Sequence, residues 1–367
     1  MQLRSKLLAL AAGLAFAASA QADIKIGVIS SATGPVSLIG IPQKNTVALM
    51  PTEIAGEKVE YITFDDASDP SNTVTLIKKL ISEENIDALV GPSSSPNAMA
   101  VLDFIAEAKV PTLAPVGTIA IVLPMDDKRR WVFKTTQNDG LVADKLFKHM
   151  KETGKKTVGF IGTGDTFGET WYKVAQDYAK KYGIEIVANE RFKRPDTSVT
   201  GQALKVLSAK PDAVLIAAPG GPAVLPQATL TDMGYKGTFY QTHGAALKEF
   251  IKLGGKKVEG TILGGSLMLA PEDAPDSNPA KKVALEYINA YKDKYVEVPE
   301  RAVPAALKKG EPGTEAFRVA LRDELEKVKD LAGTQGVYNM TPEDHSGFDE
   351  RGVELLTIEN GEFQLVK

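Results

Sequence analysis

The sequence predicts an α/β protein built from two doubly wound lobes, each with a parallel sheet covered by helices on both faces. Two observations support this fold class. Short apolar runs typical of buried strands alternate with amphipathic segments of helical spacing, which is the βαβ rhythm of parallel sheets. The rhythm restarts after Thr136, so the chain of 367 residues holds two such lobes in succession.

The first set of elements spans residues 24–114. We expect strands over residues 24–29, 59–64, 88–90 and 112–114. Asp69 or Ser71 can cap a helix that has apolar residues at helical spacing, and Pro96 begins a second helix of the same kind.

The second set spans residues 139–241, and the last third of the chain differs from both. Helices are expected over residues 139–150, 170–182, 201–208 and 223–233, and strands over 157–161, 184–188, 213–217 and 238–241. Two amphipathic helices rich in Lys and Glu follow, over residues 279–295 and 314–328. Asn360-Gly361 lies between the apolar runs 353–358 and 363–366, which predicts a closing β-hairpin.

The first 22 residues have the pattern of a secretory signal peptide. Arg4 and Lys6 precede an apolar run over residues 7–18 that is too short to span a bilayer, and Ala20 and Ala22 are spaced for a signal peptidase. An ordinary amphipathic helix would need a polar face within that run, which has none. We therefore expect cleavage after Ala22 and an exported protein of 345 residues (367 minus 22).

Composition excludes several classes of function. The exported chain would carry 41 basic side chains (43 minus Arg4 and Lys6) and 47 acidic ones without a basic patch, so nucleic acid is not an expected partner. The absence of cysteine excludes disulfides, thiolate metal sites and a lipid-modified cysteine anchor. An exported and untethered protein of this kind fits the Gram-negative periplasm.

Familiar motifs of catalysis and cofactor binding do not occur in the sequence. The three histidines form no His-Glu-x-x-His pattern, and there is neither a Gly-x-Ser-x-Gly elbow nor a phosphate loop. Residues 162–168, Gly-Thr-Gly-Asp-Thr-Phe-Gly, are similar to a dinucleotide loop, but the third glycine is one position late, so a tight strand-to-helix turn explains them better. We expect no enzyme activity, no metal and no cofactor.

Two loops at neighbouring strand ends have the chemistry of a binding site. Residues 91–97, Gly-Pro-Ser-Ser-Ser-Pro-Asn, supply hydroxyls and free amides at a helix start, which together bind anions. The simpler alternative is that Ser95 only caps the helix. Residues 115–118, Pro-Val-Gly-Thr, follow the next strand. Ligands of open α/β sheets bind at such adjacent strand ends.

Taken together, these residues resemble a known family. Ile26-Gly27-Val28, Thr33-Gly34-Pro35, the stretch 65–70 (Asp-Asp-Ala-Ser-Asp-Pro) and the two loops occur in this order in periplasmic solute-binding proteins of ABC importers, in the subfamily of the leucine/isoleucine/valine-binding protein. The resemblance runs from about residue 24 to the C-terminal hairpin. It implies the type I periplasmic binding fold, in which a three-strand hinge joins two lobes around the solute. The first lobe would comprise residues 23–120 and 260–336, and the second residues 121–259 and 337–367.

The resemblance also implies a binding site. Ser95 and Thr118 would hold a solute carboxylate through their hydroxyls, and the backbone at Val116 and Gly117 would add an amide or a carbonyl. The remaining positions follow from their place in the chain: Leu38 and Ile39 as an apolar wall of the first lobe, Phe167 as an aromatic of the second lobe, and Pro219 and Gly220 where the family often has aromatics.

Two departures from the family bear on the solute. Amino-acid binders hold the α-ammonium with an acidic residue on the loop after the strand 238–241, and here that position is His243. An imidazole cannot replace a carboxylate there, and a buried ammonium without a counter-charge costs several kcal/mol or more, a rough figure. The alternative is that His243 is a core histidine beside the cleft. Near Pro299-Glu300, about one helix length is missing compared with the family, which alters the wall of the first lobe.

We therefore expect a monomeric receptor that captures a small apolar or aromatic carboxylate and presents it to the inner-membrane permease of an ABC importer. A branched-chain or other hydrophobic amino acid is the alternative solute. Two other classes of protein are weighed against this one. A secreted hydrolase would need Ser95 and His243 within hydrogen-bond reach. A ligand-sensing regulator of the same fold would act in the cytoplasm, against which the signal peptide argues.

Overall fold

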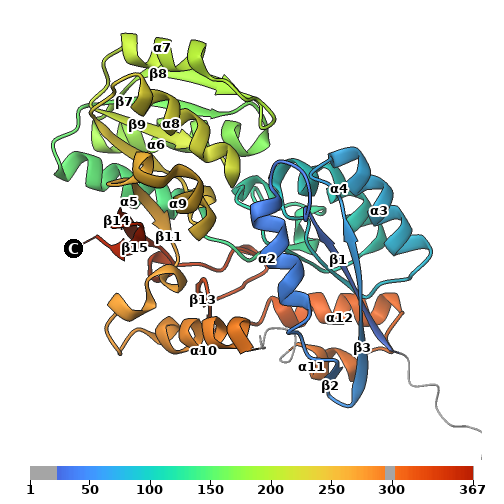
Figure 1. Cartoon of the computed structure of the whole chain (residues 1–367). Coiled ribbons are helices and arrows are strands. Elements are labelled where there is room, and N and C mark those ends of the chain that lie inside the picture. Colours follow the sequence, from blue (N-terminus) through green and yellow to red (C-terminus); the bar gives the residue numbers. More distant parts are fainter. Residues whose placement is uncertain (1–22, 294–301, 367) are drawn as a thin grey trace, which may run out of the picture.

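In the computed structural model, which describes residues 23–293 and 302–366, two α/β lobes lie side by side and the chain passes between them three times (Figure 1). The expected signal peptide and the segment around Pro299-Glu300 lie outside the described residues. Within the described part, no helix combines the length and the apolar character needed to cross a membrane.

The first lobe is built on a six-stranded sheet in the order β2-β3-β1-β4-β5-β6. All neighbouring strands pair in parallel except β2 with β3. The strands are β1 (Ile24–Ser30), β2 (Glu53–Ile54), β3 (Glu57–Asp65), β4 (Ala88–Val90), β5 (Thr112–Ala114) and β6 (Val132–Lys134); the helices of this lobe are α2 (Ser37–Val47), α3 (Pro70–Ser82), α4 (Ser95–Ala108), α11 (Val303–Leu307) and α12 (Glu315–Leu325).

Helices cover both faces of this sheet, as its apolar strands require. Ile77 of α3 and Val101 of α4 are buried against one face, whereas Val303 of α11 and Phe317 of α12 are buried against the other. The start of α3 follows from local chemistry, because the Asp69 carboxylate accepts two backbone amides of the first turn. Full burial of an aliphatic or aromatic side chain of this size stabilises the fold by about 1.5–3 kcal/mol.

The second lobe has a seven-stranded sheet in the order β15-β14-β11-β10-β9-β7-β8. Helices α5 and α6 pack on one face and α7, α8 and α9 on the other. The strands are β7 (Thr157–Thr163), β8 (Glu185–Phe192), β9 (Ala213–Ala217), β10 (Thr238–Gln241), β11 (Ile262–Gly265), β14 (Glu354–Glu359) and β15 (Glu362–Leu365); the helices are α5 (Asp139–Glu152), α6 (Thr166–Tyr182), α7 (Thr200–Ser208), α8 (Val224–Asp232) and α9 (Lys248–Gly254).

Three segments connect the lobes, after β6, after β11 and after the small β12–β13 hairpin (Leu331–Gly333 and Gly336–Tyr338). The first and third segments are hydrogen-bonded to each other. The Lys134 amide donates to the His345 carbonyl at 2.8 Å, and the Tyr338 hydroxyl donates to the Thr135 carbonyl at 2.9 Å. Helix α10 (Pro279–Asp293) follows the second crossing and contacts both strands of the hairpin.

The strand pairing shifts the lobe boundaries from those expected at residues 120 and 260. Strand β6 pairs with β5, so the chain stays in the first lobe to Lys134. Strand β11 pairs with β10, so the second lobe extends to Gly265. In both cases a strand of the sheet follows the residue at which we placed the boundary: β6 is the edge strand of the first sheet, and β11 lies between β10 and β14 inside the second.

The expected strands and helices of both lobes are present, and so is the C-terminal hairpin, in which Asn360 and Gly361 have the positive φ angles that a tight two-residue turn requires. Helix α2 was not expected from the sequence. Its interior contains Pro42, a residue that disfavours helices, and no side chain caps its start, so the local sequence does not indicate a helix.

The carboxylate of Asp66 ties the elements of the first lobe together. Asp66 is fully buried after β3 and accepts four hydrogen bonds, from the Ser31 hydroxyl after β1 (2.7 Å), the Ser68 amide (2.9 Å), the Thr73 hydroxyl of α3 (3.0 Å) and the Asn97 side chain of α4 (2.8 Å). The carboxyl ends of β1 and β3 are thereby fixed to the starts of both helices.

We expect Asp66→Ala to lower the free energy of unfolding by about 3–5 kcal/mol, because it leaves several buried donors without an acceptor. The matched control is Asp69→Ala in the same loop, which removes an exposed cap and should cost about 1 kcal/mol. Urea unfolding of both variants measures the difference, and equal costs would contradict the role given to Asp66.

Candidate functional site

A cavity of about 240 Å³ lies between the two lobes. Its first-lobe wall comes from α2, the serine loop (residues 93–95) and the loop after β5. Its second-lobe wall comes from the start of α6 and the loops after β8, β9 and β10. The segments that connect the lobes add further lining residues, among them Thr136, Ser266 and Gln335. Ligands of open α/β sheets bind at such carboxyl ends of strands.

Six of the ten residues expected at the site line this cavity. They come from both lobes and include both hydroxyl and aromatic groups: Ile39, Ser95, Gly117, Phe167, Pro219 and His243.

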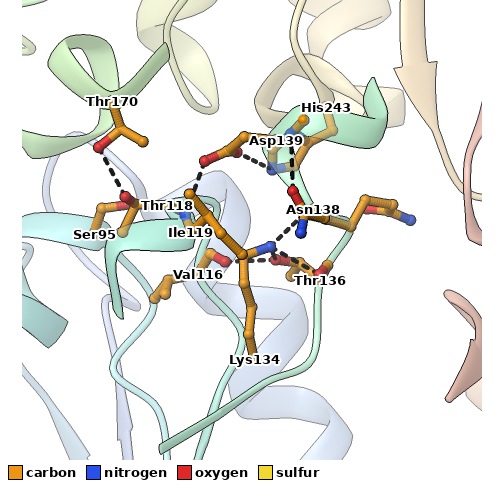
Figure 2. A network of polar contacts seen from close by, with 12 residues as sticks. Ser95, Val116, Thr118, Ile119, Lys134, Thr136, Asn138, Asp139, Thr170 and His243 are labelled. Atoms are coloured by element: carbon orange, nitrogen blue, oxygen red, sulfur yellow. Dashed lines mark hydrogen bonds and ion pairs between the residues drawn. The ribbon is translucent and has the colours of Figure 1, made fainter. Parts of the chain in front are cut away.

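The other four do not line it. The Thr118 hydroxyl is hydrogen-bonded to the Thr170 hydroxyl of α6 at 2.9 Å (Figure 2). The Val116 carbonyl accepts a hydrogen bond from the Thr136 hydroxyl. Leu38 and Gly220 are adjacent in the chain to the lining residues Ile39 and Pro219, and Gly220 also lies close to the Ile39 side chain.

The serine loop differs from the expected helix cap. Helix α4 begins at Ser95, one residue earlier than expected, and Ser94 is in the cap position. The Ser94 hydroxyl donates to the Asn97 side chain at 2.6 Å, and no side chain accepts from the first helix amides. The amide of Thr118 donates to the Ser95 hydroxyl at 3.3 Å. The helix start therefore keeps its anion-binding amides.

His243 lies at the cavity wall. Both of its ring nitrogens are buried, and neither has a hydrogen-bond partner among the described residues. Its side chain is 6% exposed, and its Nε2 lies 3.9 Å from Asp139 Oδ1. Burial, and to a smaller extent the nearby charge of Lys134, lower the pKa of His243 to about 3, so the imidazole is neutral at physiological pH.

Behind His243 lies a buried pair of charges that sequence reasoning missed (Figure 2). Lys134 at the end of β6 donates to the carbonyl and hydroxyl of Thr136 at 2.8 and 3.0 Å, and to the Gln137 carbonyl. Asp139 accepts the Ile119 amide at 2.8 Å. Burial lowers the pKa of Lys134 and raises the pKa of Asp139, and each charge opposes the shift of the other. No single motif indicates this pair, because a lysine within an apolar strand ordinarily faces solvent.

Arg194 was also missed, and it is the cationic side chain of the cavity wall. It follows β8 in the second lobe, and its Nε donates to Asp165 Oδ2 at 2.6 Å. Among the described residues that line the cavity there is this guanidinium and the imidazole of His243, but no Asp or Glu. A guanidinium and an imidazole supply hydrogen-bond donors of the kind that bind anionic groups.

Ser95 and His243 do not form a catalytic pair. Neither ring nitrogen of His243 is hydrogen-bonded within the part of the chain that the structure describes, whereas the Ser95 hydroxyl is occupied by the amide of Thr118. An activated serine needs a base within hydrogen-bond reach, so the geometry lends no support to the hydrolase alternative.

The lobes touch at Gly117. A Cβ atom built on Gly117 would lie 2.4 Å from the Phe167 ring and 3.0 Å from His243 Nε2, both of the second lobe. Such distances are shorter than van der Waals contact, so only glycine permits this approach. Together with the hydrogen bond between Thr118 and Thr170, this is a direct contact between the two lobes beside the cavity.

Two lobes, three connecting segments and a cavity between the lobes define a solute receptor of the hinged, two-lobed class. The chain belongs to the periplasmic binding protein family, whose model matches residues 23–360.

Similar proteins and solved structures support this assignment. The chain is 29% identical over 306 residues to the Leu/Ile/Val-binding protein BraC3 of Rhizobium johnstonii, an alignment that covers 79% of this chain and 82% of that protein. An extracellular ligand-binding receptor from Rhodopseudomonas palustris HaA2 is 46% identical with a TM-score of 0.91, covering 94% of this chain and all of that one (100%).

A more distant structure shares the fold alone. It is a solute-binding protein of an ABC transporter from R. palustris in complex with 4-hydroxybenzoate, at 19% identity and a TM-score of 0.77, covering 94% of this chain and 96% of that one. The expected family and fold class are thus confirmed, and these relatives are solute-binding proteins rather than enzymes.

We expect Gly117→Ala to hold the lobes apart and to weaken solute binding at least tenfold, because its methyl group meets Phe167 and His243. Small-angle scattering should show a larger radius of gyration than for the unmodified protein. Gly164→Ala is the control, since a Cβ there meets no atom closer than 3.7 Å. An unchanged radius and affinity in Gly117→Ala would contradict the close approach of the lobes.

Because His243 is buried in its neutral form, the free energy of unfolding should decrease as the pH is lowered. Between pH 6.5, the ordinary pKa of an unfolded histidine, and about 3, the unfolded chain binds a proton that the folded protein does not. At pH 4.5 this linkage amounts to about 2–3 kcal/mol. Relative to His243→Gln, the unmodified protein should therefore lose that much more stability between pH 7 and pH 4.5 in urea unfolding. Parallel pH profiles would show that His243 titrates normally.

Proposed function

We propose that this protein captures a small carboxylate with an apolar body in the interlobe cavity and presents it to the permease of an ABC importer. The observation that carries the proposal is the set of polar groups at the cavity wall: the guanidinium of Arg194 and the neutral imidazole of His243 line it, and no described lining residue is acidic. A carboxylate is the anionic group that such donors bind best.

The first lobe supplies the groups for this carboxylate. Ser95 and the uncapped amides of α4 lie at the positive end of a helix of 14 residues. A neutral imidazole at His243 can donate one N–H to a carboxylate, hydroxyl or carbonyl oxygen. Phe167, Ile39 and Leu269 supply an apolar surface for the rest of the solute.

The amino-acid alternative is favoured by the names of relatives such as the Leu/Ile/Val-binding protein BraC3. It requires a carboxylate for the α-ammonium. The nearest buried one, Asp139, lies behind His243, does not line the cavity, and is partly neutralised by the charge of Lys134. An ammonium in this cavity would lose its hydration without gaining a counter-charge.

The remaining parts of the proposal concern the cell. The family is periplasmic, which fits the expected signal peptide, with cleavage after Ala22. We infer a monomer in which solute stabilises the closed arrangement of the lobes, and this closed form is what the inner-membrane permease recognises.

Calorimetry with matched pairs of solutes tests the proposal on the unmodified protein. We expect 4-methylpentanoate and 3-phenylpropanoate to bind at least tenfold more tightly than leucine and phenylalanine, which differ mainly by the α-ammonium group. Ser95→Ala should weaken the acids by about 1.5–3 kcal/mol, the scale of a hydrogen bond to a charged group. Micromolar leucine binding without binding of the matched acids would refute the proposal.

A further inference from the structure

The guanidinium of Arg194 has a terminal nitrogen without a hydrogen-bond partner among the described residues, and it lies in the opposite lobe from the carboxylate site at Ser95 and the start of α4. Its side chain is 11% exposed, and its Nη2 is buried without a partner among the described residues. A buried guanidinium N–H without an acceptor costs free energy. Arg194 lines the cavity, so its guanidinium is placed to meet an acceptor on the solute.

Asp165 holds Arg194 without consuming its capacity to bind an anion. Asp165 Oδ2 accepts from Arg194 Nε, which fixes the plane of the guanidinium. Asp165 Oδ1 accepts the amides of Phe167 and Gly168 at 2.9 and 3.3 Å and the Thr163 hydroxyl at 3.0 Å. The start of the 17-residue helix α6 therefore already stabilises this carboxylate. The bond from Nε to Asp165 is the only side-chain hydrogen bond of Arg194 to the described residues, so its two terminal nitrogens remain as donors for a second anion.

The two groups of anion-binding donors belong to different lobes and to one cavity. Ser95 and the start of α4 lie in the first lobe, and Arg194 lies in the second. Apolar side chains, among them Ile39, Leu247 and Leu269, line the same cavity. A solute with one acidic group can pair with the donors of only one lobe. A solute with an acidic group at each end can pair with the donors of both lobes.

We propose that the solute is a dicarboxylate with an apolar body, whose first carboxylate binds at Ser95 and the start of α4 and whose second binds at Arg194. This inference rests on the proposed function and adds to it the second acidic group and the residue that selects it. Bridging the lobes through two carboxylates would also couple binding to closure.

The test compares mono- and dicarboxylates of equal chain length, from butanoate and succinate to octanoate and suberate, together with benzoate and terephthalate, by calorimetry. We expect at least one diacid to bind the unmodified protein about tenfold or more tightly than its matched monoacid, the scale of a charge-assisted hydrogen bond. In Arg194→Gln the diacid should lose that advantage, so that the diacid and its matched monoacid bind with affinities within about twofold of each other. Lys193→Gln, at an exposed neighbour outside the cavity, is the control and should change neither affinity.

Three outcomes overturn the inference in distinguishable ways. Monoacids that bind as tightly as diacids refute the second carboxylate site and leave the proposed function intact. Equal weakening of both solute classes in Arg194→Gln shows that Arg194 acts only by supporting Asp165. Binding of neither class refutes the proposed function as well. The comparison on the unmodified protein stands even if Arg194→Gln does not fold.

Discussion

The buried carboxylate of Asp66 is the interaction on which the binding site depends. It fixes Asn97 at the first turn of α4, and Asn97 in turn accepts the Ser94 hydroxyl, while Ser93 accepts the amide of Ser31. The serine loop is thus positioned by groups that lie outside the cavity. Preorganisation of this kind leaves the amides at the start of α4 free, because the hydroxyl of Ser94 is directed elsewhere.

In the second lobe, too, a carboxylate positions a side chain for the cavity, but here that side chain is a cation. There Asp165 caps α6 and holds a cation, Arg194, at the cavity wall. His243 lies between the cavity and the buried charges of Asp139 and Lys134 and is kept neutral by burial. A solute therefore encounters hydrogen-bond donors from both lobes, and closure brings these donors together because Gly117 allows Phe167 and His243 to approach it closely.

Sequence reasoning succeeded where the physical cause is local. The helix capped by Asp69 and the turn at Asn360-Gly361 follow from a few adjacent residues, and the strands follow from their periodicity. It failed where a partner is distant in the chain. Arg194 is held by Asp165, 29 residues away, and the hydroxyl of Thr118 is hydrogen-bonded to Thr170 of the other lobe. The boundaries expected at residues 120 and 260 fall before β6 and β11, whose pairing with β5 and β10 is not evident from the sequence alone.

The central claim is that the solute class depends on the absence of a carboxylate from the cavity wall, and a carboxylate at position 243 tests it most directly. The quantity to measure is the ratio of the dissociation constants of leucine and 4-methylpentanoate, in His243→Glu and in the neutral control His243→Gln. The account predicts that Glu shifts this ratio at least tenfold toward leucine relative to Gln, because it repels the acid and offers the ammonium a partner. The same ratio in both variants would show that the ammonium is recognised elsewhere and would contradict the account.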